Sequence, residues 1–241
     1  MISVCMATYN GERFLREQID SILCQLAPDD ELIISDDGST DGTLEIIESY
    51  KDKRIRLFFH EKKDGNKYYM KSNVLYATKN FENALKYAVG DYIFLSDQDD
   101  IWYENKVTES INFLKKYDFV MSNFSVVNET GVMEKDSFYE KNPIKNIFKT
   151  MFKAHFIGCC CCFKQNILNK SLPFSDGIYS HDLWLGLIGL KNGKVGYIEN
   201  PLIKHRVGFH NNSTACKKSQ NTILFRIKYR ILTLLELLKR T

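Results

Sequence analysis

Hydrophobic positions in the first hundred residues alternate between short continuous runs and stretches with helical spacing. The continuous runs predict buried strands at residues 2–9, 31–35, 55–59 and 92–96. The stretches between them predict amphipathic helices at residues 12–24, 43–50 and 81–89. Strands that alternate with helices are typical of βαβ units around a parallel sheet that helices cover on both faces. The pattern therefore indicates an α/β fold with a mostly parallel central sheet.

The pattern is less regular after residue 100. It predicts further helices at residues 105–116, 145–154 and 183–190. Extended segments are predicted at residues 119–127, 156–163 and 195–203. Residues 60–79 are polar and show no periodicity, so we expect a long loop there. The organisation that follows is one α/β domain over residues 1–210 and a C-terminal helical tail over residues 211–241.

The composition is that of an ordinary globular protein. The chain has 241 residues, of which 44% are hydrophobic and 26% charged, enough for one substantial core. The first residues lack the basic start of a signal peptide, and no eighteen apolar residues run together, so we expect a cytoplasmic protein. Four of the seven cysteines are consecutive, at 159–162, and we expect reduced thiols. Cys159 and Cys162 have zinc-ligand spacing, but no second pair follows at a suitable distance.

Positive charge is concentrated at the C-terminus. The net charge of +3 is too small to predict a nucleic-acid partner, yet residues 216–241 contain seven Lys and Arg residues and a single acid, Glu236. Apolar residues recur there with helical spacing, at positions 223, 224, 227, 231, 234, 235 and 238. Such a helix either packs on the domain or on a second subunit, or docks on the anionic face of a membrane. The sequence leaves both interpretations open.

Three carboxylates follow the predicted strand at residues 92–96. Asp97, Asp99 and Asp100 are close enough in the chain to repel one another, which favours a bound cation. Carboxylate oxygens are the ligands that Mg²⁺ and other hard divalent cations prefer. The simpler interpretation is a solvated turn that caps the next helix. On the cation interpretation, a diphosphate would complete the coordination with its own oxygens.

Two further polar segments follow predicted strands. Asp36 and Asp37 come after the run at residues 31–35, where a carboxylate could accept a hydrogen bond from a pyrimidine base or from ribose. The segment Thr8-Tyr9-Asn10-Gly11 follows the first strand, and its aromatic ring could stack on a base. Turn and helix-cap chemistry alone also explains both segments. In parallel sheets, ligands bind at the carboxyl ends of strands, where all three segments lie.

Taken together, the three segments resemble the signatures of glycosyltransferase family 2, in that family's order and at about its spacing. The resemblance extends over residues 1 to about 210. It implies the GT-A fold, a Rossmann-like αβα sandwich that binds a nucleoside diphosphate sugar. The run Ser-Asp-Gln-Asp-Asp-Ile-Trp at 96–102 resembles bacterial enzymes that build O-antigen and capsule repeat units, including rhamnosyltransferase-like members.

The resemblance also implies roles for particular residues. In the first half, the segments that match the nucleotide-sugar site supply Ala7, Thr8, Tyr9, Asn10, Asp36, Asp37, Asp97 and Gln98. Asp97 and Asp99 match the D-x-D pair that holds Mg²⁺ or Mn²⁺. In the second half, Asp182 matches the catalytic base, although His181 replaces the usual Glu before it. Arg206 and His210 resemble the family's ending, which reaches the diphosphate, but their spacing is longer than usual.

The implied reaction is inverting transfer of a sugar from a UDP- or dTDP-linked donor to a hydroxyl of a growing cell-surface glycan. The implied acceptor is linked to undecaprenyl diphosphate, which would bring the enzyme to the inner face of the cytoplasmic membrane. A nucleotidyltransferase is one alternative, but residues 8–12 are not a Gly-rich phosphate loop. A catalytically inactive module that binds sugar nucleotides is the other.

Overall fold

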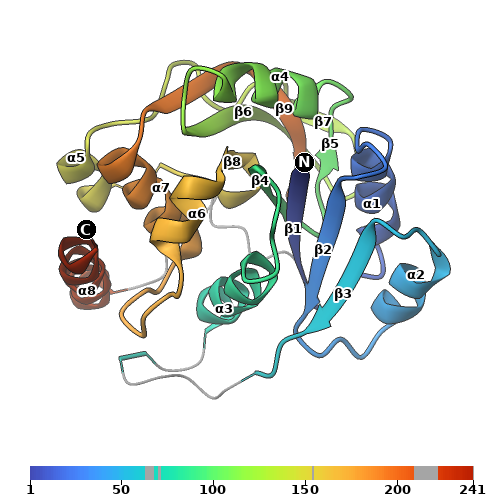
Figure 1. The fold of residues 1–241 in the computed structure, drawn as a ribbon, viewed down its shortest axis with the longest axis horizontal. Helices are drawn as coiled ribbons and strands as arrows, with labels where there is room; N and C mark the ends of the chain where they lie inside the picture. Colours follow the sequence, from blue (N-terminus) through green and yellow to red (C-terminus); the bar gives the residue numbers. More distant parts are fainter. Residues whose placement is uncertain (63–67, 70–71, 154, 209–221, 241) are drawn as a thin grey trace.

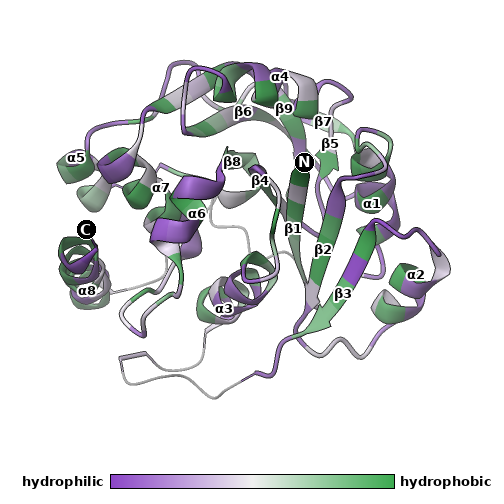
Figure 2. Cartoon of the chain, viewed as in Figure 1, coloured by the Kyte–Doolittle hydropathy of each residue, from purple (hydrophilic) through white to green (hydrophobic). Residues whose placement is uncertain are grey.

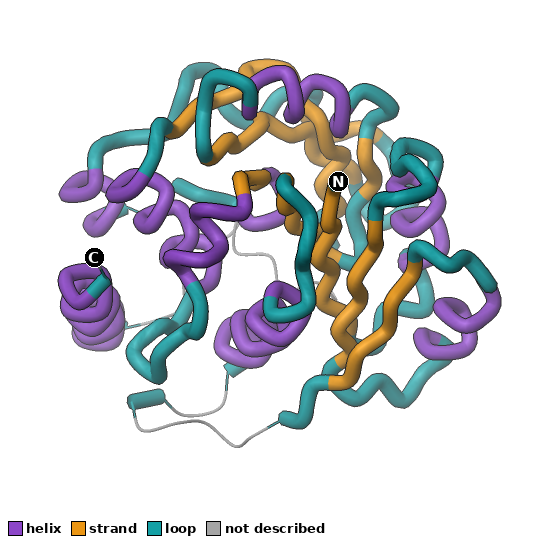
Figure 3. The backbone as a smooth tube through the Cα atoms, viewed as in Figure 1, coloured by secondary structure: helices purple, strands orange, loops and turns teal. Residues whose placement is uncertain are grey.

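The computed structural model describes residues 1–62, 68–69, 72–153, 155–208 and 222–240. Its centre is a mixed sheet of nine strands in the order β3-β2-β1-β4-β8-β6-β9-β5, with β7 paired to β6. Helices pack on both faces of this sheet, and the sheet curls around the helices of the second half of the chain (Figure 1; Figure 3). The predicted α/β sandwich is confirmed.

The first half of the sheet is parallel, as the sequence predicts. It consists of β1 (Ile2–Thr8), β2 (Glu31–Asp36), β3 (Ile55–Phe59) and β4 (Tyr92–Asp97). Side chains of β1, β2 and β4 are buried almost throughout, which is why these strands appear as continuous apolar runs. In the pairing register, Ala7 lies beside Asp97 and Thr8 beside Asp36. The carboxyl ends of the three strands therefore meet at one edge.

The second half of the sheet is mixed. It consists of β5 (Ile101–Trp102), β6 (Phe119–Val127), β7 (Met133–Lys135), β8 (Cys161–Lys164) and β9 (Val195–Arg206). β8 runs antiparallel to both β4 and β6, whereas β9 runs parallel to β6. The predicted strand at 156–163 is wrong in its first part, because Gly158–Cys160 form a 3₁₀ turn and only the last two cysteines enter β8.

Eight helices surround the sheet in the described part of the chain. They are α1 (Leu15–Leu23), α2 (Thr43–Ser49), α3 (Asn73–Leu85), α4 (Lys106–Leu114), α5 (Ile147–Phe152), α6 (Gln165–Ser171), α7 (His181–Asn192) and α8 (Ile223–Lys239). Around the parallel strands, α3 lies on one face and α1 and α2 lie on the other (Figure 1). The sequence pattern did not predict α6, a short helix that follows β8 directly.

The loop predicted over residues 60–79 is wrong in its last part, because α3 begins at Asn73. The Ser72 hydroxyl caps the helix by accepting a hydrogen bond from the Leu75 amide at 3.2 Å. The buried face of α3 carries polar residues such as Thr78 and Asn80, so it shows no apolar periodicity. The Asn80 amide donates to the Thr8 carbonyl at 3.0 Å, which ties α3 to the end of β1.

The predicted tail helix is present as α8, and it packs on the rest of the protein. The Phe225 and Tyr229 rings lie 4.9 and 5.5 Å from the Tyr179 ring, and Leu237 is 3% exposed. The predicted boundary between domain and tail, at 210 and 211, lies outside the described residues and stays a prediction. Among the described residues, no helix has both the length and the hydropathy that a bilayer crossing requires.

Candidate active site

The three carboxylates of residues 97–100 lie at the carboxyl end of β4, in different degrees of burial. Asp97 and Asp99 are half-buried, and Asp100 is completely buried. Burial and the charges of Asp100 and Asp99 raise the pKa of Asp97 to about 7, and the charge of Asp182 contributes in the same direction. Burial and the charge of Asp100 likewise raise the pKa of Asp99 to about 6. The cluster therefore carries more negative charge than its surroundings neutralise.

Two residues at the end of β9 partly counter this charge. The His205 ring contacts Asp100 Oδ1 through Nδ1 at 2.8 Å, and both side chains are at most 4% exposed. Burial alone would lower the pKa of His205, but the charge and hydrogen bond of Asp100 raise it to about 10. Arg206 Nε donates to the Asp99 carbonyl at 3.1 Å, and its Nη2 pairs with Glu17 at 2.7 Å. His205 lies in the segment that resembles the family's ending, but the sequence assigned it no role, because its contact with Asp100 joins residues far apart in the chain.

Removing His205 should therefore leave a buried carboxylate without its cation. We expect His205→Gln to lower the free energy of unfolding by about 3–5 kcal/mol, the cost typical of breaking a buried ion pair from one side. Urea denaturation followed by circular dichroism measures this loss. The double variant Asp100→Asn/His205→Gln should lose less than His205→Gln alone. A loss below about 1 kcal/mol for the single variant would show that the pair contributes little.

The donor atoms at this edge fit a hard divalent cation. Asp97 and Asp99 offer carboxylate oxygens, and Asp100 Oδ2 is buried without a hydrogen-bond partner among the described residues. Oxygen donors of this kind suit Mg²⁺ or Mn²⁺. Asp100, Cys159 and His205 also form a buried group whose candidate ligand atoms lie within 4.8 Å of one another. A hydrogen bond with Cys160, burial and the charge of Asp100 raise the pKa of the Cys159 thiol, which makes it a poor ligand.

The loop after β1 is held against the loop after β4. Gln98 Oε1 accepts from the Tyr9 amide at 2.8 Å, and Gln98 Nε2 donates to the Tyr9 carbonyl at 3.0 Å. A Cβ atom at Gly11 would lie 2.5 Å from the Gln98 side chain, so this approach requires glycine. Asn10, in the left-handed region with φ of 48°, accepts from the Thr40 amide at 2.8 Å. Ala7 is half-buried beside Asp97 in the sheet.

Asp36 is completely buried and holds the loop after β2 in shape. Its carboxylate accepts hydrogen bonds from the Thr8 hydroxyl at 2.8 Å, from the Gly38 amide at 3.0 Å and from the amide and hydroxyl of Ser39 at 2.8 and 2.6 Å. Gly38 adopts a φ of +79°, which favours glycine. These bonds explain Asp36 and Thr8 as parts of the turn. A contact of either residue with a nucleoside stays a prediction.

The Asp37 carboxylate contacts two basic residues that sequence reasoning missed. Its Oδ1 lies 2.7 Å from His60 Nδ1, and its Oδ2 lies 3.5 Å from Lys62 Nζ. The Lys62 ammonium also lies over the half-exposed Tyr9 ring, 3.0 Å from its centroid. Tyr9 and Asp37, which the sequence predicts to hold the nucleoside, are thus brought together through Lys62. Both bases lie in a segment that the sequence marks only as polar.

Asp182 lies in the first turn of α7, where the Ser180 side chain caps the helix. Its Oδ1 is 2.6 Å from His181 Nε2, and the His181 ring stacks on Phe81 of α3 with a centroid distance of 4.2 Å. Burial would lower the pKa of His181, but the charges of Asp182 and Asp97 raise it. The residue that departs from the family pattern therefore contacts the candidate base directly.

The backbone at Gly158 fits closely against this pair. A Cβ atom there would lie 2.4 Å from Asp182 Oδ1 and 2.8 Å from His181 Nε2, so any larger residue would displace the carboxylate. Arg206 is predicted to reach the diphosphate, but it is 3% exposed and fully engaged by protein groups. His210, predicted for the same role, lies outside the described residues. The roles of Arg206 and His210 stay predictions.

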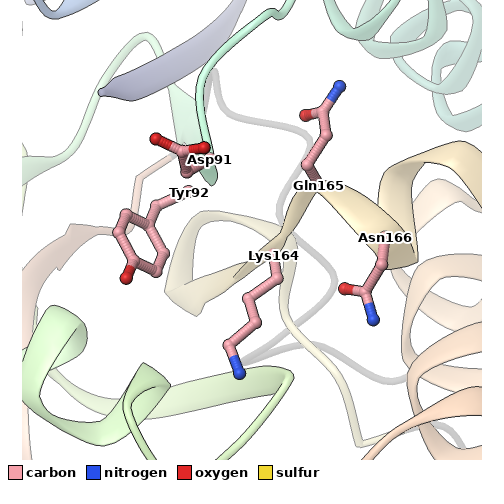
Figure 4. Close-up of a pocket in the computed structure, with 5 residues that line it drawn as sticks. All are labelled: Asp91, Tyr92, Lys164, Gln165 and Asn166. Carbon is pink, nitrogen blue, oxygen red and sulfur yellow. The ribbon is translucent and has the colours of Figure 1, made fainter.

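A separate surface pocket lies at the opposite end of β4 from the acidic cluster. Its lining consists of Asp91, Tyr92, Lys164, Gln165 and Asn166 (Figure 4). These residues come from the amino end of β4 and from the junction of β8 with α6. The pocket carries none of the residues that the sequence predicts for the site.

The chain is similar in sequence to bacterial glycosyltransferases. It is 29% identical over 222 residues to the UDP-Glc:alpha-D-GlcNAc-diphosphoundecaprenol beta-1,3-glucosyltransferase WfgD of Escherichia coli. The matched region covers 90% of this chain and 81% of WfgD. The chain is 30% identical over 196 residues to WfaP of Escherichia coli, a glucosyltransferase of the same name as WfgD. The match covers 78% of this chain and 70% of WfaP. An uncharacterized glycosyltransferase of Rickettsia felis is 30% identical, but the chain spans only 34% of its length.

Solved structures show the same fold at lower identity. S. aureus TarS 1-349 in complex with UDP-GlcNAc superposes with a TM-score of 0.71 and 19% identity, over 97% of this chain and 66% of that one. The mannosyltransferase PcManGT from Pyrobaculum calidifontis, in complex with GDP-Man and Mn²⁺, gives a TM-score of 0.60 and 16% identity, over 98% and 69%. The family model for glycosyl transferase family 2 matches residues 3–172. The chain therefore belongs to glycosyltransferase family 2.

Proposed function

We propose that this protein transfers a sugar from a nucleoside diphosphate sugar, UDP- or dTDP-linked, to a hydroxyl of a growing cell-surface glycan. The observation that carries the proposal is the position of Asp182. It lies at the start of α7, paired with His181 at 2.6 Å, where its charge acts on Asp97 of the acidic cluster. This supports the proposal that Asp182 serves the acceptor while the acidic cluster serves the donor.

The chain's own residues divide the reaction into two tasks. Tyr9 and Asp37 would hold the nucleoside, and Asp97 and Asp99 would hold a divalent cation, which would supply positive charge for the leaving diphosphate. Asp182 accepts the proton of the attacking hydroxyl as the general base. A single base on the face opposite the nucleotide gives inversion at the transferred sugar. His181 orients the carboxylate of Asp182, since its ring is fixed between Phe81 and the backbone of Gly158.

The acceptor that we propose is a glycan on undecaprenyl diphosphate. The support is the similarity to WfgD and WfaP, each of which is a UDP-Glc:alpha-D-GlcNAc-diphosphoundecaprenol beta-1,3-glucosyltransferase. A lipid-linked acceptor requires access to the inner face of the cytoplasmic membrane. The basic α8 is the element that we predict for that contact, with pairing of two subunits as the alternative.

A screen of nucleotide sugars tests the proposed function. We expect one UDP- or dTDP-sugar to release its nucleoside diphosphate when Mn²⁺ or Mg²⁺ and a short acceptor carrying a sugar diphosphate are present. Nuclear magnetic resonance of the product then reports the anomeric configuration, which should be inverted. Release of pyrophosphate from a nucleoside triphosphate would instead identify a nucleotidyltransferase. Tight donor binding without turnover of any donor would identify an inactive module.

A further inference from the structure

Helices α5 and α8 lie next to each other along one side of the molecule, and both leave apolar side chains uncovered (Figure 1). Phe148 and Phe152 of α5 are each 77% exposed. The uncovered residues of α8 are between 48% and 81% exposed, and they are Ile223, Leu224, Ile227, Ile231, Leu235 and Leu238. Figure 2 shows strongly hydrophobic positions on both helices. Exposed apolar residues gathered in this way mark an interaction surface.

The uncovered residues of α8 are not needed to hold the helix on the protein. At 100° per residue they fall within one third of the helix circumference. The residues that pack inward lie on the other side, where Phe225 and Tyr229 contact Tyr179 and where Thr233 and Leu237 are buried. The helix therefore has an aromatic inner face and an aliphatic outer face. The six outer residues belong to the apolar pattern that is visible in the sequence.

α5 repeats this arrangement on a smaller scale. Phe148 and Phe152 are one turn apart, so they lie on the same face, and two of the three residues between them, Thr150 and Met151, are buried. The Asn146 side chain caps the helix by accepting from the Lys149 amide at 3.0 Å. The capped helix thus presents two aromatic rings that nothing in the described chain covers.

Basic residues surround both apolar faces. Residues 141–153 contain four exposed lysines at every fourth position, Lys141, Lys145, Lys149 and Lys153, and no acid. Residues 223–240 add the exposed Lys228 and Lys239 beside the outer face of α8, whereas Arg226, Arg230 and Arg240 are half-buried. The single acid of the two segments, Glu236, pairs with Lys239 at 2.7 Å. The surface therefore combines exposed aromatic and aliphatic side chains with a strong excess of positive charge.

We propose that α5 and α8 together form a docking surface for an anionic lipid bilayer. Apolar side chains would enter the headgroup region, while the lysines and arginines contact anionic headgroups. A second copy of the chain fits this surface poorly, because pairing like faces would bring two sets of six exposed lysines together. The inference rests on the proposed function, because a lipid-linked acceptor is the reason for the protein to bind a membrane. α8 packs on Tyr179, next to the Ser180 cap of α7, so docking would place the candidate base near a lipid-linked acceptor.

Co-sedimentation of the full chain with vesicles tests the docking surface. We expect binding to vesicles of phosphatidylglycerol and phosphatidylethanolamine and little binding to pure phosphatidylcholine. Phe148→Ser/Phe152→Ser should lower the partition coefficient at least tenfold. The triple variant Lys145→Gln/Lys149→Gln/Lys153→Gln should lower it about a hundredfold, because each basic residue near the surface contributes about fivefold. Added salt should release the wild-type protein.

Matched variants elsewhere on the surface provide the controls. Val89→Ser/Val132→Ser removes two residues that are 65% and 59% exposed outside the two helices, and Lys115→Gln/Lys116→Gln removes two exposed charges. Both should bind vesicles like the wild type. Equal losses in control and test variants, or no loss in either test variant, would overturn the proposal. So would a wild-type dimer in sedimentation velocity that Phe148→Ser/Phe152→Ser converts to a monomer without any vesicle binding.

Release of nucleoside diphosphate with a soluble acceptor is measured in parallel. The two variants that are designed to weaken vesicle binding should keep this activity, since none of the substituted residues belongs to the candidate active site. Vesicle binding by a protein that turns over no donor would leave the docking surface intact and overturn the proposed function. Turnover without vesicle binding would leave the proposed function intact and overturn the docking surface.

Discussion

Replacing Asp99 with Asn is expected to lower turnover by about a thousandfold or more. The counter-charge that a metal ion gives a leaving diphosphate is worth several kcal/mol, and the variant loses one of its proposed carboxylate ligands. The same substitution should leave the melting temperature unchanged or raise it. Burial and the charge of Asp100 already raise the pKa of Asp99 to about 6, so the native carboxylate is held at a cost that a neutral amide avoids.

Three measurements examine this expectation. Release of nucleoside diphosphate gives the rate, calorimetry with and without Mn²⁺ gives the metal-dependent part of donor binding, and thermal denaturation gives the stability. Asp91→Asn is the matched control, because Asp91 is an exposed carboxylate that precedes β4, at the other end of the same strand. It should leave rate and metal dependence unchanged. Full activity of the wild-type protein in EDTA would refute the metal assignment.

The sequence predicts the parallel half of the sheet and the position of the site because both depend on local signals. Buried strands appear as apolar runs, and the acids that follow them must meet where the strands end. Asp36, Asp37 and Asp97 are found in this way. His60 and Lys62 are not, because they follow β3, the strand beside β2, and only acids were sought at the strand ends. No spacing within the chain relates His205 to Asp100.

Two differences in secondary structure have physical causes in the site itself. The first part of α3 shows no apolar periodicity because its buried positions include polar residues. Thr78 donates a hydrogen bond to the Tyr179 carbonyl, and Asn80 donates one to the Thr8 carbonyl at the end of β1. The strand expected at 156–163 starts late because Gly158 turns to approach Asp182. In both places the chain departs from regular patterning where it builds the surroundings of the candidate base.

Asp182→Asn is expected to lower the transfer rate by about 10²–10⁴-fold, the range typical for loss of a general base. The amide keeps the shape of the carboxylate and still fits against Gly158, but it accepts no proton from the acceptor hydroxyl. Donor affinity should persist, because Asp182 acts on the acceptor, whereas Asp97 and Asp99 are the proposed donor-side carboxylates. The rate is measured at saturating donor, and donor affinity by calorimetry on the same preparation.

The control for Asp182 must separate catalysis from the ordinary benefit of an acid in the first turn of a helix. Glu45 is such an acid in α2 and is exposed, so Glu45→Gln removes a helix-terminal charge without touching the site. It should cost a few tenths of a kcal/mol in stability at most and nothing in rate. If donor affinity fell in parallel with the rate in Asp182→Asn, Asp182 would be a donor-binding group and not the base. A rate within about threefold of the wild type would exclude the role of general base, because even a weak general base contributes about a hundredfold.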